Sequence, residues 1–139
     1  MGAGQPSIFA RIVAGEIPCQ RVFENEHVLA FLDINPLAEG HTLLLPKRTV
    51  ARLEDLTPDE AAEMGRCLVI VARKIIAATG AEGYNVLENN GQVASQEVPH
   101  VHFHIIPRRA GDGLGFRWKP QQRSREELDA LAERIRAVP

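Results

Sequence analysis

Cysteine is scarce in this 139-residue chain, which has two, Cys19 and Cys67. They lie far apart and share no spacing typical of a disulfide framework or a thiolate metal site, so we expect two free thiols. No apolar run approaches the roughly 20 residues that a membrane-spanning helix needs. Residues 1–6, Met-Gly-Ala-Gly-Gln-Pro, lack both the charged start and the apolar stretch of a secretory signal. We therefore expect a cytoplasmic protein that has no membrane partner.

An excess of positive charge is also missing. Sixteen Lys and Arg residues stand against eighteen Asp and Glu, and the formal net charge is −2. Without a basic block, binding of a nucleic acid polymer is not expected. The hydrophobic fraction of 45% is ordinary for a globular protein. The length predicts a single domain over 1–139, with a core at about 7–120 and a C-terminal helix at about 124–137.

Hydrophobic periodicity and turn residues predict five strands and short terminal helices. A short amphipathic helix is expected at 7–13, and a capping box of Ser124 and Glu127 begins the last helix. The expected strands are a hairpin of 21–24 and 27–33, a buried strand 41–45, a strand 84–89, and a strand 100–106 closed by Pro107. This content favours an α+β fold with an antiparallel sheet.

One long helix is predicted from a capping box at Thr57 and Glu60 to a stop at Gly80. Its apolar stripe consists of Met64, Leu68, Val71 and Ile75. Cys67 and Ile70 widen the apolar surface beyond what one sheet face needs. We therefore predict a two-fold symmetric homodimer that uses the surplus.

Three of the five histidines are His100, His102 and His104, which alternate with Val101 and Phe103. Side chains alternate faces along a strand, so the three imidazoles should point the same way. A purely structural row is one interpretation, although burial makes charged histidine costly. A zinc site is another, but about 13 Å between the first and third Cα atoms makes joint chelation awkward.

A row of imidazoles suits phosphoryl chemistry better. Neutral imidazole is a nucleophile near physiological pH, because its ordinary pKa is about 6.5. The negatively charged phosphoryl oxygens then need donors nearby. A polar loop just before the row supplies candidates for a phosphate cradle: Asn89, Asn90, Gly91, Ser95 and Gln96. Gly91 would allow a positive φ and close backbone approach.

The run His-Val-His-Phe-His-Ile-Ile at 100–106 resembles the signature of the histidine triad family. Further blocks at 8–18, 30–36 and 40–47 resemble the same family in order and spacing, and the resemblance covers about residues 7–120. It implies an α+β fold that dimerises through its long helix and a strand into one continuous sheet. It also implies nucleoside phosphate substrates related to AMP or GMP.

The resemblance assigns roles to four histidines. His102 would form a nucleotidyl intermediate, His104 would lie near the leaving group, and His100 would support them. His41 would pack behind the nucleophile and help to fix its tautomer. The nucleoside pocket would consist of Ile8, Phe9, Ile12, Phe31, Asp33, Ile34 and Leu43, in which the carboxylate accepts hydrogen bonds from the ribose.

Two positions depart from the family pattern near the phosphate. Ser95 stands where glycine is frequent, and its Cβ restricts backbone approach. Glu97 stands where many relatives carry Ser or Thr, and a carboxylate there disfavours a polyanionic leaving group.

A structural zinc is found in many bacterial relatives. Its ligands other than the first triad histidine would correspond here to Ser7, Ala10 and Thr49, so we predict no metal and no cofactor.

The leading hypothesis is hydrolysis or transfer at the α-phosphorus of purine nucleoside phosphoramidates or related esters, through a nucleotidyl-histidine. Hydrolysis of dinucleoside polyphosphates would use the same catalytic residues. A nucleotide-binding adaptor with vestigial catalysis is the alternative from another class. The role of Trp118 and the residues after it stays open.

Overall fold

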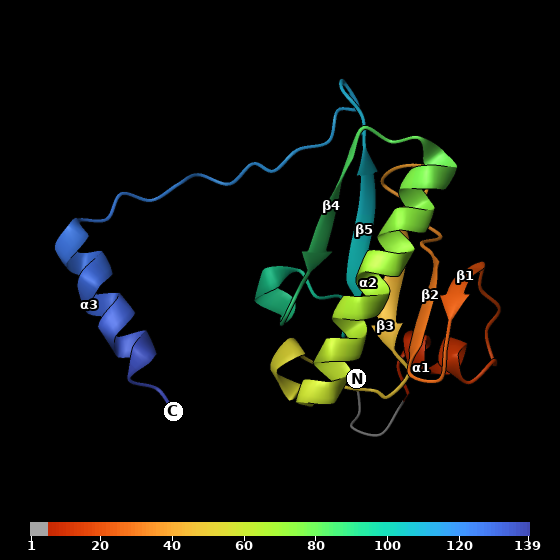
Figure 1. The fold of residues 1–139 in the computed structure, drawn as a ribbon, viewed down its shortest axis with the longest axis horizontal. Coiled ribbons are helices and arrows are strands. Elements are labelled where there is room, and N and C mark those ends of the chain that lie inside the picture. The colour runs from red at the N-terminus through yellow and green to blue at the C-terminus, as the bar shows by residue number, and fades with distance from the viewer. Residues whose placement is uncertain (1–5) are drawn as a thin grey trace.

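The computed structural model describes residues 6–139 and shows an α+β fold (Figure 1). The helices are α1 (Ile8–Val13), α2 (Pro58–Thr79) and α3 (Arg125–Arg136), with short 3-10 turns at Leu53–Asp55 and Gln92–Ala94. The strands are β1 (Arg21–Glu24), β2 (Val28–Leu32), β3 (Thr42–Pro46), β4 (Gly83–Glu88) and β5 (Phe103–Arg108). Our expectations for residues 1–5 lie outside the described part.

The five strands form one antiparallel sheet in the order β1-β2-β3-β5-β4, so the expected fold class is confirmed. Each face of the sheet carries its own apolar cluster. Val28, Ala30, Leu44 and Ile105 pack against α2 on one face. Alternate residues on the other face form a cluster with Phe9 of α1, namely Leu29, Phe31, Leu43 and Leu45. Because β3 is covered on both sides, all of its residues are buried.

The long helix α2 begins and ends where its sequence signals predict. Thr57 and Glu60 form the capping box, and Gly80 ends the helix in the left-handed conformation at φ 66°. Our expectation that Cys67 belongs to an outward apolar surplus is wrong, because its side chain is fully buried against the sheet. The large apolar residue that the helix does expose is Val69, at 50%.

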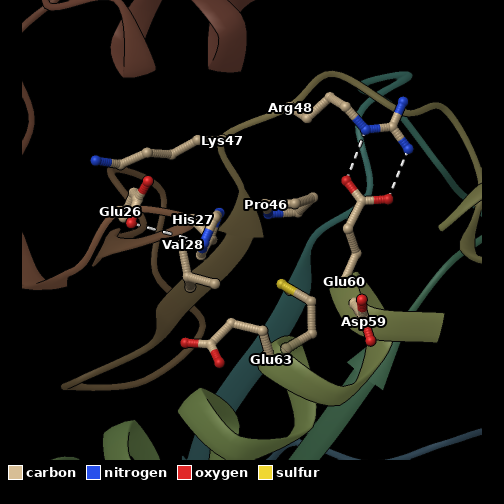
Figure 2. A pocket seen from close by; sticks show the side chains of 10 residues that line it. Glu26, His27, Val28, Pro46, Lys47, Arg48, Asp59, Glu60 and Glu63 are labelled. Atoms are coloured by element: carbon tan, nitrogen blue, oxygen red, sulfur yellow. Dashed lines mark hydrogen bonds and ion pairs between the residues drawn. The ribbon is translucent and has the colours of Figure 1, made fainter. Parts of the chain in front are cut away.

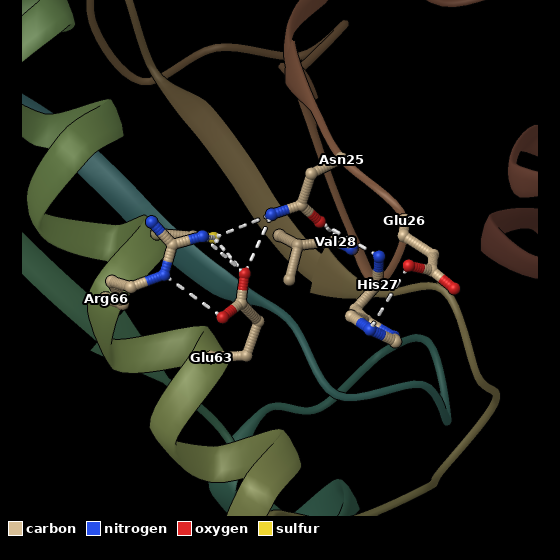
Figure 3. Close-up of polar contacts among 7 residues, drawn as sticks. Asn25, Glu26, His27, Val28, Glu63 and Arg66 are labelled. Carbon is tan, nitrogen blue, oxygen red and sulfur yellow. Dashed lines mark hydrogen bonds and ion pairs between the residues drawn. The ribbon is translucent and has the colours of Figure 1, made fainter.

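A polar cluster ties the start of α2 to the β1–β2 turn (Figure 3). The Asn25 amide oxygen accepts hydrogen bonds from the backbone N–H groups of His27 and Val28, both at 2.9 Å. Its amide nitrogen donates to Glu63 at 2.8 Å and contacts the sulfur of Cys67 at 3.4 Å. Hydrogen bonds from Arg66, Asn25 and Cys67 lower the pKa of Glu63 to about 2. The polar groups of the cluster are hydrogen-bonded to one another, which gives the cluster a structural role.

The histidine strand differs from our expectation at both ends. We placed it from His100 to Ile106 with Pro107 as its stop, whereas β5 begins at Phe103 and continues through Pro107 to Arg108. The preceding residues bond to a loop, since the Val101 N–H donates to the Val50 carbonyl at 2.8 Å. Pro107 pairs with Tyr84 of β4, while pairing with β3 reaches only Ile105. A proline is tolerated where a strand has a neighbour on one side only.

The C-terminal part of the chain leaves this body as an arm. After β5 an extended segment runs out past the edge strand β4, and α3 lies apart from the sheet (Figure 1). The predicted capping box is confirmed, with Ser124 accepting from the Glu127 N–H at 3.1 Å. Among residues 6–139, no helix combines the length and apolar character required to cross a membrane.

Candidate functional site

Four histidines and Phe9 converge on the α1 face of the sheet. The Phe9 ring centroid lies 6.2 Å from that of His100 and 4.9 Å from that of His102. The ring centroids of His102 and His104 are 5.0 Å apart, and those of His104 and His41 are 5.2 Å apart. The imidazoles thus form a continuous row, although His100 and His102 join it from extended chain ahead of β5.

The tautomer of His102 follows from its hydrogen bond. Its Nδ1 lies 2.7 Å from the carbonyl oxygen of His100, which can only accept. Nδ1 therefore carries the proton, and the lone pair is on Nε2. A lone pair held in one direction is what a nucleophilic imidazole requires.

A second hydrogen-bond chain orients His104. The backbone N–H of Leu37 donates to His41 Nδ1 at 3.0 Å, so the proton of neutral His41 is on Nε2. That N–H donates to His104 Nδ1 at 2.9 Å, which leaves His104 with its own proton on Nε2. Our expectation that His41 fixes the tautomer of His102 is therefore wrong. His41 bonds to His104, and the His100 carbonyl orients His102.

All four imidazoles are held neutral by burial. Desolvation lowers the pKa of His41, His100 and His102 below the ordinary value. Burial, helped by the neighbouring His102 and His41, lowers the pKa of His104 to about 4. Asp33 and Glu97 act against this shift at His102, because a carboxylate favours the charged imidazole. A neutral row near pH 7 provides a free lone pair on His102 and a neutral donor on His104.

His100 is fully buried and bonds backward into the fold. Its Nε2–H donates to the carbonyl of Pro46 at 2.7 Å, while Nδ1 has no partner among the described residues. The bond joins the row to the end of β3, which gives His100 a supporting place. Neither the Pro46 nor the Leu37 backbone group could be identified from side-chain chemistry in the sequence.

Two sets of residues have to be tested as metal sites. Asp33, His41 and His104 offer ligand atoms within 4.8 Å of one another. However, Nδ1 of His41 accepts from Leu37 and Nε2 carries a proton, so His41 has no lone pair free for a metal. This cluster fits a hydrogen-bond chain better than a metal site.

The positions of the relatives' zinc ligands fit the metal no better. The Ser7 hydroxyl caps α1 by accepting from the Ala10 N–H at 3.0 Å, and Ala10 has no donor atom in its side chain. Thr49 is exposed and offers only a hydroxyl. Since structural zinc takes thiolate, imidazole or carboxylate ligands, this set does not suit it, and absence of zinc stays a prediction.

The predicted nucleoside pocket separates into two parts. Phe9, Phe31 and Leu43 are buried in the α1-side cluster, with Ile12 half-buried against them. Ile8 and Ile34 are exposed, at 47% and 79%.

Asp33 lies beside these residues, with one carboxylate oxygen accepting from the Asn35 N–H at 2.8 Å. Its other oxygen is 3.6 Å from His41 Nε2. The structure thus brings an apolar wall and a carboxylate to the same side of the sheet as the histidines.

The loop before the triad, residues 89–97, is held in shape by positive φ angles and by hydrogen bonds of Gln96. Gly91 adopts a φ of 89°, as expected, and Ser95 has the left-handed φ of 72°. Gln96, predicted to contact phosphate, is buried, and both ends of its side-chain amide bond to backbone groups, one in this loop and one in another segment. Its oxygen accepts from the Gly91 N–H at 2.7 Å and its nitrogen donates to the Ala51 carbonyl at 2.6 Å. Gln96 therefore shapes the loop.

The other predicted loop residues lie near its surface. Asn89 makes a long 3.5 Å bond to the Ser95 carbonyl, and Ser95 and Glu97 are exposed. These side chains are accessible from the solvent side of the loop.

A pocket of about 330 Å³ lies elsewhere, beside the first turn of α2 (Figure 2). Its apolar base, Val28 and Met64, belongs to the cluster under α2, on the sheet face opposite the histidines. At its rim Arg48 and Glu60 form a two-pronged ion pair at 2.6 and 2.7 Å, and this lowers the pKa of Glu60 to about 2. No residue predicted for the site lines this pocket.

Comparison with known proteins agrees with the motif blocks. The HIT domain model matches residues 14–111. The adenosine 5'-monophosphoramidase of Schizosaccharomyces pombe is 44% identical over 129 residues, which cover 92% of this chain and 94% of that protein. A solved HIT family protein from Bacillus subtilis superposes with a TM-score of 0.92 at 38% identity, over 97% of this chain and 98% of that one. Another, from Bacillus anthracis, gives 0.90 at 40% identity, over 95% and 96%. The chain therefore belongs to the HIT family, the histidine triad proteins.

Proposed function

We propose that this protein hydrolyses nucleoside phosphoramidates, with His102 as the nucleophile. The observation that carries the proposal is the orientation of His102, whose Nδ1–H is held by the His100 carbonyl at 2.7 Å. The Nε2 lone pair is thereby available, and burial lowers the pKa so that it stays unprotonated near pH 7. The name of the S. pombe relative, an adenosine 5'-monophosphoramidase, supports the same substrate class.

The proposed reaction has two displacement steps at the α-phosphorus. His102 Nε2 forms a bond to phosphorus while the P–N bond to the leaving amine breaks. The amine leaves with a proton from solvent, while the Nε2–H of His104, whose Nδ1 remains bonded to His41, donates a hydrogen bond to the leaving nitrogen. Water then attacks phosphorus, the bond to His102 breaks, and a nucleoside monophosphate is released. The proton that this water loses returns to solvent, so both histidines end the cycle neutral.

The exposed pocket residues suit the nucleoside. Ile8 and Ile34 can cover the two sides of a base, and the free oxygen of Asp33 can accept a hydrogen bond from the ribose. Of the loop residues, Gly91 and Ser95 turn the backbone. We expect the Asn89 amide, which makes only a long bond to the Ser95 carbonyl, to donate to the phosphate. We expect Gln96 to act indirectly by keeping this loop in shape.

The charges around the nucleophile favour an amine as the leaving group. Asp33 and Glu97 are the charged groups that act on His102, and both are carboxylates. Among the described residues, no lysine or arginine acts on any of the four histidines strongly enough to shift its pKa. A departing polyphosphate would therefore be repelled by these two carboxylates. Dinucleoside polyphosphate hydrolysis remains the second candidate.

Rapid quench with radiolabelled adenosine phosphoramidate tests the nucleophile. A nucleotidyl adduct should appear on the wild-type protein, be acid-labile, and be absent from His102→Asn. The variant should lose several orders of magnitude in kcat, with nucleotide affinity little changed because the pocket is intact. His27→Asn, at an exposed histidine, is the matched control. Near-normal turnover by His102→Asn, or an adduct on another side chain, would refute the mechanism.

One further substrate and one ligand measurement separate the alternatives. Faster turnover of a diadenosine polyphosphate than of the phosphoramidate would favour the second candidate. Binding of AMP without turnover of either substrate would favour an adaptor role.

We also propose a cytoplasmic homodimer. The edge strand β4 has an unpaired side and exposes Tyr84 and Val86, at 46% and 43%. Val69 of α2 adds an exposed apolar side chain. Strand pairing at β4 would join two sheets and cover this surface, which an exposed edge otherwise leaves open to aggregation. Sedimentation as a 15.3 kDa monomer at micromolar concentrations would contradict the dimer.

A further inference from the structure

Glu97 is a carboxylate beside the histidine row that the fold itself does not use. Its side chain is exposed, and among residues 6–139 it accepts no hydrogen bond and forms no ion pair. Asp33, by contrast, accepts from the Asn35 N–H and faces His41. A free carboxylate in a site that handles phosphate repels the substrate, unless the substrate brings a positive charge of its own.

The chain holds Glu97 in place from both sides. Before it, the backbone N–H of Gln96 donates to the Gly91 carbonyl at 3.1 Å, and the Gln96 side chain accepts from the Gly91 N–H. After it, Val98 packs against the α1-side cluster, and its carbonyl accepts from the His100 N–H at 2.8 Å. Only the side-chain torsions of Glu97 are free, so the carboxylate stays beside the row.

The two carboxylates near the nucleophile act on different parts of the row. Asp33 acts on His41, His102 and His104, whereas Glu97 acts on His102. The Asp33 side chain is mostly enclosed, at 19% exposed, while that of Glu97 stands in solvent. Asp33 therefore belongs to the enclosed part of the site, and Glu97 to its open side.

The leaving group departs toward that open side. In an in-line displacement the leaving nitrogen lies on the side of phosphorus opposite to the nucleophile. His102 is buried at 6% exposed, so the side of phosphorus opposite to it is the one that faces solvent. Whatever the leaving nitrogen carries extends into this region, where Glu97 attracts a positive group and repels a negative one.

We infer that Glu97 selects leaving amines that carry a second positive charge, so that the preferred substrates are nucleoside phosphoramidates of diamines and similar cationic amines. The inference rests on the proposed function and names its leaving group. The bond changes are those given above, and the second ammonium stays protonated throughout. Because an exposed ion pair is weak, the preference should be about three- to fivefold in kcat/KM.

Two adenosine phosphoramidates of matched length test the preference. One is made from 1,5-diaminopentane and ends in an ammonium group, and the other is made from n-hexylamine and ends in a methyl group. The wild-type protein should have the higher kcat/KM on the diamine derivative at low ionic strength. The ratio of the two values should fall toward one in about 1 M salt, where charges are screened beyond about 3 Å.

Variants assign the preference to the side chain. Glu97→Gln should bring the ratio to about one, and Glu97→Lys should reverse it. A purely structural effect would change both substrates alike and leave their ratio unaltered, as would a loss of folded protein. The matched control is Glu126→Gln, which removes the same charge from an exposed position in α3 and should keep the wild-type ratio.

The possible failures are distinguishable. Equal kcat/KM for the two substrates in the wild-type protein overturns this inference and leaves the proposed function standing. A preference that persists in Glu97→Gln belongs to another group and overturns the role of Glu97. Turnover of neither phosphoramidate refutes the proposed function, and this inference with it.

Discussion

Lowering the pH should destabilise the protein through the buried histidines before its carboxylates titrate. In the unfolded chain a histidine has a pKa near 6.5, whereas burial and the neighbouring imidazoles lower that of His104 to about 4 in the fold. Between these values the unfolded chain binds the proton and the folded chain does not. The free energy of unfolding therefore falls as the pH falls from 6.5 toward 4, and the stabilisation is fully present above pH 6.5.

The expected size follows from the two pKa values. Between pH 8 and pH 5 His104 alone should lower the free energy of unfolding by about 2 kcal/mol. His41, His100 and His102 are shifted in the same direction and should add to the loss. The paired carboxylates, such as Glu60 with its pKa of about 2, lose their stabilisation only at lower pH.

Urea unfolding at several pH values from 5 to 8 measures the effect. His104→Asn should flatten the dependence of the unfolding free energy on pH, because the variant lacks one depressed group. His27→Asn should keep the wild-type dependence, because His27 is exposed. An unfolding free energy that stays constant from pH 8 to pH 5, or an unchanged slope in His104→Asn, would refute this reasoning. The activity of the wild type should likewise persist below pH 6.5, since the pKa of His102 is lowered.

Three other outcomes are expected. Gly40→Ala should lower the unfolding free energy by about 2–4 kcal/mol in urea titrations. The reasons are the φ of +88° at Gly40 and the 2.8 Å that would separate the new Cβ from the Thr79 methyl group. The control Gly65→Ala, with open space around the new Cβ, should not destabilise the protein. Ser95→Gly should raise the melting temperature modestly, because glycine adopts the left-handed φ of 72° without the steric cost of a Cβ, and this gain exceeds the added chain entropy of the unfolded state. A lower melting temperature would contradict the strain argument. Purified protein should contain no stoichiometric zinc by elemental analysis and should keep its activity in chelator, whereas about one zinc per chain would refute the ligand argument.

Local sequence signals were sufficient for most secondary structure. Capping boxes mark the starts of α2 and α3, and Gly80 marks the end of α2. These signals act through bonds within a few residues, so they can be read without knowledge of the fold. The start of β5 could not be read in this way. The alternation of His100 to His104 looks like one strand, but pairing with distant residues decides where a ladder begins.

The same division holds for the site. The residue types and spacing of the triad were enough to predict a row of imidazoles, and the family resemblance implied the role proposed for His102. They could not reveal which nitrogen carries each proton, because the deciding partners are backbone groups of Leu37, Pro46 and His100. The internal bonds of the Gln96 side chain could not be predicted for the same reason, since its partners Gly91 and Ala51 are brought to it by the fold.

By itself, the sequence determined the family chemistry, the α+β content and the ends of the helices, because each depends on residue type and short-range spacing. The tertiary structure alone decided the tautomers of the histidines, the lowering of their pKa values and the pairing of His41 with His104. It also decided that Cys67 faces inward and that α3 stands away from the body. These features depend on burial and on contacts between residues far apart in the chain, which only the packed fold specifies.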